Sequence, residues 1–168
     1  MIYNFNADAI LEMAEQIERN GAAFYHTAAR RVLSPAVKEM LIRLAKMEEE
    51  HERTFAAFRK ELAKPEGSPS FLELDADVQK YLLALSNTRV FQKDKKPDLK
   101  ISATHSEADI LEEIYRSAIR AEKDSIVFYV GLRELVPVTF GKLKIDAIIK
   151  EEMQHITMLS IELAGLKT

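Results

Sequence analysis

Two copies of the pattern Glu-x-x-His are the residues of this sequence whose types and spacing are best suited to chemistry. They are Glu48 with His51 and Glu152 with His155. Residues three apart on a helix share a face about one turn apart, so this carboxylate and imidazole can bind one metal ion. A single copy is weak evidence, because glutamate-rich helices that face solvent contain it often.

An internal repeat connects the two copies. Moving the chain by 104 positions (48 to 152) aligns both Glu-x-x-His patterns, and it also aligns Glu18 with Glu122 and Tyr25 with Tyr129. The agreement is concentrated on polar residues within otherwise apolar helical stripes, which composition alone does not readily supply. The sequence therefore predicts a duplicated helical hairpin that carries the same polar residues in both copies.

The turn positions predict that the two glutamates of each hairpin lie at one height. The midpoint of residues 18 and 48 is 33, beside the Ser34-Pro35 turn, and the midpoint of 122 and 152 is Pro137. At a rise of ~1.5 Å per residue, each glutamate lies about 22 Å from its turn. Antiparallel helices in each hairpin then bring its two glutamates side by side.

Charge balance predicts what these residues would bind. Four buried carboxylates without a counter-charge are costly or must take up protons. Two divalent cations balance four glutamates and two neutral imidazoles, and this is the ligand set of the carboxylate-bridged di-metal site of four-helix bundles. Oxygen and imidazole ligands suit iron or manganese, and zinc can take their place. The predicted ligands are Glu18, Glu48, His51, Glu122, Glu152 and His155.

Helix-breaking and capping residues define the predicted elements. We expect four long helices, at about 7–32, 35–63, 107–136 and 141–166. The expected N-terminal caps are Asn6, Ser34 before Pro35, and Ser106 with Asp109 as a capping box. The connection 64–106 is long enough to contain structure, and Asp75 can cap a short helix over 76–86. The predicted fold is all-α: a single domain, 1–168, of two antiparallel hairpins joined by a long crossover.

Composition narrows the function further. The chain has 168 residues, of which 47% are hydrophobic and 30% charged, with a net charge of -3 and no cysteine. The absence of cysteine excludes disulfides, thiolate metal sites and thiol catalysis. The charge offers no footprint for nucleic acid, and no apolar stretch approaches the length of a membrane span. We expect a soluble, cytoplasmic protein with neither kind of partner.

The run Glu15-Gln16-Ile17-Glu18-Arg19-Asn20-Gly21-Ala22-Ala23-Phe24-Tyr25 resembles the first-helix signature of the rubrerythrin-like branch of the ferritin-like di-iron superfamily. The resemblance spans the four long helices and leaves the crossover unmatched. It implies a ferritin-like bundle that reduces hydrogen peroxide or oxygen with two iron(II) ions. By position, it assigns Glu18 and Glu122 to the family's single glutamates and the two Glu-x-x-His pairs to its remaining ligands.

Two departures from that family change what the resemblance implies. Ser125 stands where rubrerythrins typically carry an extra glutamate, so their iron-shifting peroxidase mechanism is not carried over. Without cysteine the chain has no rubredoxin module, so electrons must come from an external donor such as a rubredoxin-type protein. The six ligands resemble the ferroxidase centre of bacterioferritin equally well.

Residues around the predicted ligands receive more modest interpretations. Tyr25 and Tyr129, two turns beyond Glu18 and Glu122, are either core aromatics or hydrogen-bond donors that orient a ligand carboxylate. Gly21 and Ser125 leave space beside the metals for a small oxidant or serve close helix packing. The remaining acidic residues near the motifs are expected on solvated outer faces, and His26 and His105 at the surface. Those acidic residues are Glu12, Glu15, Glu49, Glu50, Glu52 and Glu151.

Three functions remain open from the sequence. The leading one is a di-iron oxidoreductase, a homodimer whose catalytic group is the di-metal centre itself and which needs no other cofactor. The second is a ferroxidase that stores or delivers iron. The third is a non-enzymatic helical module with structural metal such as zinc, although structural zinc sites usually close with four ligands.

Overall fold

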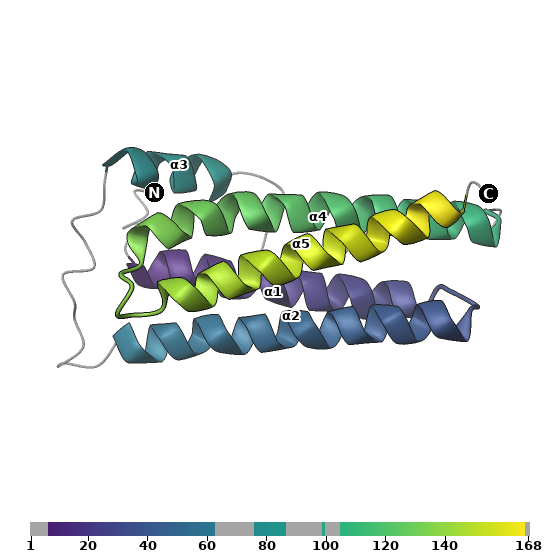
Figure 1. The fold of residues 1–168 in the computed structure, drawn as a ribbon, viewed down its shortest axis with the longest axis horizontal. Coiled ribbons are helices and arrows are strands. Elements are labelled where there is room, and N and C mark those ends of the chain that lie inside the picture. The colour runs from purple at the N-terminus through teal and green to yellow at the C-terminus, as the bar shows by residue number, and fades with distance from the viewer. Residues whose placement is uncertain (1–6, 63–75, 87–98, 100–104, 167–168) are drawn as a thin grey trace.

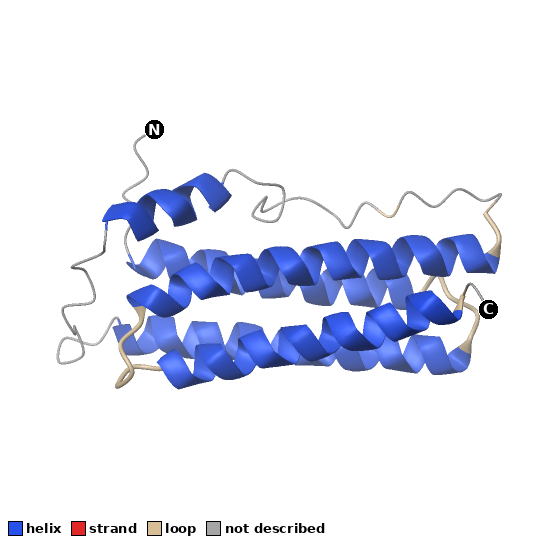
Figure 2. Cartoon of the chain, turned by 45° about the horizontal axis from the view of Figure 1, so that its top comes forward, coloured by secondary structure: helices blue, strands red, loops and turns tan. Residues whose placement is uncertain are grey.

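The part of the chain that this computed structural model describes, residues 7–62, 76–86, 99 and 105–166, is almost entirely helical and contains no strand (Figure 2). Its helices are α1 (Ala7–Ala29), α2 (Pro35–Leu62), α3 (Ala76–Ser86), α4 (Glu107–Leu135) and α5 (Lys142–Gly165). The predicted all-α class is confirmed. None of these helices is both long and apolar enough to cross a membrane.

The four long helices lie side by side as two antiparallel pairs (Figure 1). α1 pairs with α2 through a short turn at one end of the molecule, and α4 pairs with α5 through a turn at the other end. The colours of Figure 1 show that α2 and α4 run in the same direction. α1 also contacts α4, so the pairs pack against each other along their length.

The helices begin where the sequence places caps. Ser106 accepts a hydrogen bond from the backbone N–H of Asp109, and the Asp109 carboxylate accepts one from the Ser106 N–H at 3.1 Å, which completes the capping box of α4. At α2, the Ser34 hydroxyl accepts from the Val37 N–H at 3.4 Å. These two caps are confirmed. The proposed caps Asn6 and Asp75 lie outside the described residues.

The end of α1 differs most from expectation. The stripe predicts helix to residue 32, but α1 ends at Ala29. The N–H of Arg31 bonds to the carbonyl of Ala28 at 2.9 Å, a three-residue spacing that tightens the last turn. The chain must reverse before α2 begins at Pro35, so residues 32–34 leave the helix while Val32 stays buried. The other long helices end within one residue of the prediction.

Two apolar clusters fill the bundle, one toward each end. The first joins the start of α1 and the end of α2 to the end of α4 and the start of α5 and includes Ile10, Phe55 and Ile145. The second joins the opposite ends of the same helices and includes Leu41 and Ile114. The polar residues of the predicted stripes lie between the clusters. Burial of the clusters, at roughly 25 cal/mol per Å² of apolar surface, therefore holds the centre of the bundle in place.

The short helix α3 covers the outer side of α4 near its C-terminal end (Figures 1 and 2). The Tyr81 hydroxyl donates to the carbonyl of Val127 at 2.7 Å, and Leu82 is fully buried. A Cβ at Gly131 would lie 2.6 Å from the Tyr81 ring, so the glycine permits this close approach. The predicted helix over 76–86 is thus present and anchored on the bundle.

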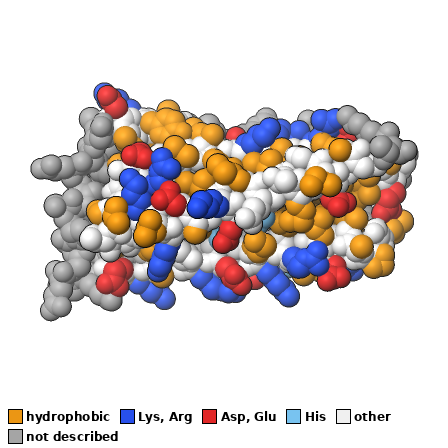
Figure 3. All heavy atoms as spheres, viewed as in Figure 1, with side chains coloured by type: hydrophobic (Ala, Val, Ile, Leu, Met, Phe, Trp, Pro, Cys, Tyr) orange, Lys and Arg blue, Asp and Glu red, His pale blue; other side chains and the backbone are white. Residues whose placement is uncertain are grey.

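Side chains of both charge signs are interspersed on the face shown in Figure 3. Lysine and arginine alternate there with acidic and hydrophobic side chains, and neither sign forms a large patch. This face therefore offers no basic surface of the kind that nucleic acid requires.

Candidate metal centre

All six predicted ligands meet in the middle of the bundle. Each of the four long helices contributes to the cluster, and every member is at most 4% exposed. They are Glu18 from α1, Glu48 and His51 from α2, Glu122 from α4, and Glu152 and His155 from α5. Charged residues are almost never this buried without a partner, so the cluster requires a physical explanation.

The six residues form two overlapping groups of four whose ligand atoms lie within 4.8 Å of one another. One group is Glu18, Glu48, His51 and Glu152, and the other is Glu48, Glu122, Glu152 and His155. Glu48 and Glu152 belong to both groups. Each group can hold one metal ion, and each takes ligands from both hairpins.

The imidazole rings direct their Nδ1 atoms at the carboxylates. Nδ1 of His51 lies 3.1 Å from a Glu152 oxygen and 3.5 Å from a Glu18 oxygen. Nδ1 of His155 lies 2.9 Å from the other Glu152 oxygen and 3.3 Å from oxygens of both Glu48 and Glu122. The two rings are nearly parallel, with centroids 6.2 Å apart.

These facing atoms fit a pair of cations. Buried polar atoms in folded proteins are normally hydrogen-bonded, and exceptions need a reason. Within the described residues, six of the atoms at these short distances are buried and lack a hydrogen-bond partner, whereas Oε1 of Glu122 accepts from Tyr25. The six atoms are Glu18 Oε2, Glu48 Oε1, His51 Nδ1, Glu152 Oε1 and Oε2, and His155 Nδ1. Oxygen and nitrogen lone pairs that converge without donors between them are suited to a metal ion.

Burial raises the pKa of three of the four carboxyl groups, those of Glu18, Glu48 and Glu122. The charges of neighbouring carboxylates add to this effect for Glu48 and Glu122. Glu152 is the exception: burial acts to raise its pKa, but the two imidazoles against it lower the value to about 2. Glu152 is therefore the central anion of the metal-free cluster.

The two imidazoles respond in the opposite way. Burial acts to lower the pKa of His51 and His155, but the surrounding carboxylates outweigh it and raise both values to about 12. Without metal, the cluster therefore balances its charge by holding protons. Metal ions would have to displace these protons, because a histidine must be neutral to ligate.

Two tyrosines link the hairpins at the cluster. The Tyr25 hydroxyl of α1 donates to Glu122 of α4, and the Tyr129 hydroxyl of α4 donates to Glu18 of α1. Burial, together with the nearby carboxylates, raises the pKa of both phenols well above the ordinary value, so they remain donors. Of the two interpretations given above, these contacts favour orientation of a ligand carboxylate.

Gly21 accommodates a ligand carboxylate. A Cβ at this position would lie 3.0 Å from Oε2 of Glu48 and 3.3 Å from its Cδ. The matching residue of the second hairpin, Ser125, donates its hydroxyl to the Ala121 carbonyl of its own helix at 3.0 Å. Gly21 thus gives room to the Glu48 side chain of the facing helix. Of the two interpretations from the sequence, space for a small oxidant and close helix packing, this contact favours close packing.

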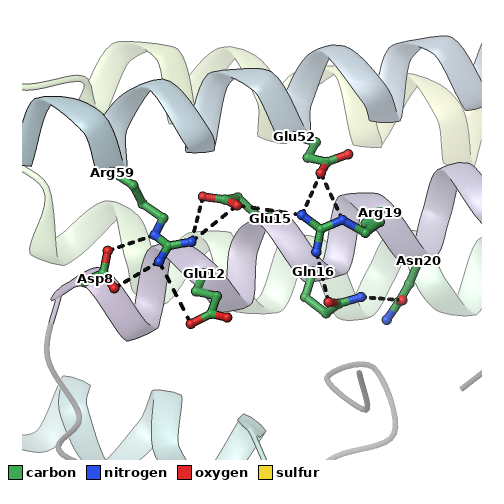
Figure 4. Close-up of polar contacts among 8 residues, drawn as sticks. All are labelled: Asp8, Glu12, Glu15, Gln16, Arg19, Asn20, Glu52 and Arg59. Atoms are coloured by element: carbon green, nitrogen blue, oxygen red, sulfur yellow. Dashed lines mark hydrogen bonds and ion pairs between the residues drawn. The ribbon is translucent and has the colours of Figure 1, made fainter. Parts of the chain in front are cut away.

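The expectation that Glu15 lies on a solvated outer face is wrong. Glu15 is only 8% exposed and lies in the seam between α1 and α2, 3.2 Å from Arg59 and 3.7 Å from Arg19 (Figure 4). Arg59 also contacts Asp8, and Arg19 contacts Glu52, so the guanidinium groups join the two helices (Figure 4). The two arginines permit this carboxylate to be buried.

Two other outer-face residues make specific contacts. Glu49 lies 2.9 Å from Nε2 of His26, which is partly exposed on α1, while His105 is exposed before α4. Glu151 has a closer connection to the cluster, because its carboxylate accepts a hydrogen bond from Nε2 of His51 at 2.8 Å. This contact was not predicted from the sequence. The general tendency of a ligating histidine to donate its second N–H to a carboxylate would have prompted a search for one.

Comparison with known proteins adds no relative. No protein-family model, curated protein or solved structure matches the chain. The likeness to rubrerythrin-like proteins therefore depends on the sequence run and the ligand pattern described above. The buried cluster of glutamates and histidines, which can hold metal ions, is what the structure itself contributes.

Proposed function

We propose that this chain is a di-iron oxidoreductase of the rubrerythrin-like kind, which binds two ions at the buried cluster and reduces hydrogen peroxide or oxygen. The observation that carries the proposal is the pair of overlapping four-residue groups that share Glu48 and Glu152. Each group would hold one ion, and Glu48 and Glu152 would contribute to both positions. Bound iron(II) would supply the electrons and the Lewis acidity for this chemistry.

Charge favours two divalent ions over one. Four ionised carboxylates and two neutral imidazoles carry a charge that two divalent cations cancel, whereas a single cation would leave a buried excess of negative charge. Manganese or zinc satisfies the same charge balance. The ligands therefore favour two divalent ions but discriminate less between one metal and another.

The chain's own residues prepare this site. The Tyr25 and Tyr129 hydroxyls hold Glu122 and Glu18, each from the opposite hairpin. The apolar clusters on both sides exclude water, which strengthens electrostatic interactions within the site. The tyrosine contacts would hold two of the ligand carboxylates in place before any ion or oxidant arrives.

The ferritin-like connectivity is part of the same proposal. α2 and α4 run in the same direction, so α2 ends and α4 begins at opposite ends of the bundle (Figure 1). This arrangement of the described helices supports a ferritin-like connectivity. We further propose a homodimer that takes electrons from an external redox protein, since the chain contains no cysteine for a rubredoxin-type centre.

Anaerobic loading with iron(II) followed by stopped-flow mixing with hydrogen peroxide tests this function. We expect two irons per chain and oxidation faster than that of free iron(II) under the same conditions. Glu48→Gln should lose both the loading and the rate, while Glu50→Gln, a change on the exposed side of the same helix, should retain them.

Three outcomes would contradict the proposal or select another function. Oxidation no faster than for free iron(II) would exclude the oxidoreductase. A large cage in solution holding many irons per chain would indicate iron storage. Zinc that resists exchange with iron would indicate a structural site.

A further inference from the structure

The two histidines of the cluster differ at the nitrogen that faces away from the carboxylates. Nε2 of His51 donates to the Glu151 carboxylate of α5 at 2.8 Å, and the Glu151 side chain is 44% exposed. Nε2 of His155 is buried and has no hydrogen-bond partner within the described residues. At the nitrogen that faces away from the other ligands, one imidazole therefore has a carboxylate partner and the other has none among the described residues.

The sequence encodes this difference. The repeat relates position 151 to position 47 (151 minus 104), which is Met47 on α2. A methionine thioether is only a weak acceptor and carries no charge, so it cannot replace a carboxylate as the partner of an imidazole N–H. The three ligands of the first hairpin recur in the second, but this neighbouring position does not.

A carboxylate at the second nitrogen changes how an imidazole binds metal. It fixes the tautomer that leaves Nδ1 free, holds the ring in one orientation and increases the basicity of Nδ1. His51 has this support from Glu151. His155 has no such partner at Nε2 among the described residues, so only its Nδ1 contacts and packing orient the ring. More of its binding energy is therefore spent on fixing the ring.

We propose that Glu151 is a positioning residue for His51 and makes the two metal positions unequal. The position of Glu18 and His51 fills first and holds its ion more tightly than the position of Glu122 and His155. The inference rests on the proposed function, because it requires that the cluster bind two ions.

Titration of the metal-free protein with Co²⁺, followed by calorimetry and visible absorption, tests the inference. We expect two binding steps whose affinities differ by roughly 10–100-fold, the usual effect of a carboxylate behind a ligating histidine. Glu151→Met makes position 151 identical to position 47, so the first step should weaken by about that factor and the two steps should merge.

Two controls separate this effect from general damage. Glu39→Met makes the same chemical change at an exposed residue in the second turn of α2 and should leave both steps unchanged. Glu151→Gln keeps an acceptor oxygen without its charge and should give an intermediate first step. Circular dichroism of each variant should match that of the original protein.

Two histidine variants identify which position fills first. His155→Ala should retain the tighter step and lose the weaker one, and His51→Ala should do the opposite. The reverse pattern would overturn the inference.

The possible failures are distinguishable. A protein that binds no Co²⁺ and no iron would overturn the proposed function and the inference together. Two ions bound with equal affinity in the original protein, or two distinct steps that persist unchanged in Glu151→Met, would overturn the inference and leave the proposed function standing.

Discussion

The half of the cluster around His51 and the half around His155 use the same ligand types but have different surroundings. In each half, the glutamate that belongs to that group alone, Glu18 or Glu122, accepts a hydrogen bond from a tyrosine of the opposite hairpin. The halves differ in the residues around these ligands. Glu151, which contacts His51, has Met47 as its counterpart in the repeat, and Gly21, which lies against Glu48, has Ser125. The ligands set how much charge the cluster can hold, and their neighbours determine how alike the two positions are.

The largest effect that we expect distinguishes shared from unshared ligands. Glu152→Gln alters both groups and should abolish loading of both ions, whereas Glu18→Gln alters one group and should leave about one ion per chain. Loss of a direct ligand should exceed the roughly 10–100-fold effect of losing a partner behind a ligand. Metal analysis after equilibrium dialysis measures this, and equal losses in both variants would contradict the two-group arrangement.

The pH dependence of the metal-free protein should affect both halves alike. The folded-state pKa values of His51 and His155 are raised to about 12 from 6.5. Because the folded protein holds these protons more tightly, their stabilisation is complete below pH 6.5 and is lost as pH rises from there toward 12. The pKa values of the carboxyl groups of Glu18, Glu48 and Glu122 are also raised, so these groups likewise lower the stability of the metal-free protein as pH rises above 4.5.

The metal-free protein should therefore become less stable between pH 6.5 and 8.5, by up to about 1.4 kcal/mol per pH unit for each histidine. The lowered pKa of Glu152 opposes this trend only as pH falls from 4.5 toward about 2, outside that interval. Urea denaturation with a chelator present measures the effect. The metal-loaded protein should show the reverse trend, because protons then compete with the ions.

Removing either inter-hairpin hydroxyl should cost about the same. Tyr25→Phe and Tyr129→Phe each leave a buried carboxyl without its donor, which should lower the free energy of unfolding by ~1–3 kcal/mol. Tyr81→Phe removes a more exposed hydroxyl on α3 and should cost less. Chemical denaturation compares the three variants, and a much smaller loss for one inter-hairpin tyrosine would reveal a second difference between the halves.

The smallest effect that we expect concerns Gly21 and its counterpart in the repeat, Ser125. Gly21→Ala gains up to ~1 kcal/mol of helix propensity, but its Cβ would lie 3.0 Å from Glu48 Oε2. We expect little change in metal-free stability and weaker loading, because the carboxylate must move. Ser125→Ala removes only a bond within α4 and should leave loading unchanged. Thermal melting and Co²⁺ titration of both variants test this.

Much of the fold follows from local signals in the sequence. Helical periodicity and the serine caps place α2, α4 and α5 to within a residue, because capping depends on neighbouring groups of the same segment. The end of α1 does not follow, since the chain reversal before Pro35 overrides the continuing apolar stripe. The pairing of the predicted glutamates within each hairpin required only equal distances from the turn that joins its two helices.

The surroundings of the cluster were harder to predict. Glu49, Glu50 and Glu151 look alike in the sequence, yet Glu151 alone of these is hydrogen-bonded to a predicted ligand among the described contacts. Which surface glutamate reaches the facing helix depends on the rotation and crossing of the helices, which an apolar stripe does not set to within one residue. The burial of Glu15 likewise depends on an arginine from the facing helix.

The covalent joining of both hairpins in one chain has a consequence for the inequality at positions 47 and 151. Two separate copies of one hairpin, packed about a twofold axis, would place identical residues beside both histidines, and mutation would always change both sides together. Because each hairpin here has its own codons, Glu151 and Met47 can differ while the ligands stay matched. Joining both hairpins in one chain therefore permits a site whose two halves differ. A symmetric dimer of half-chains cannot form such a site.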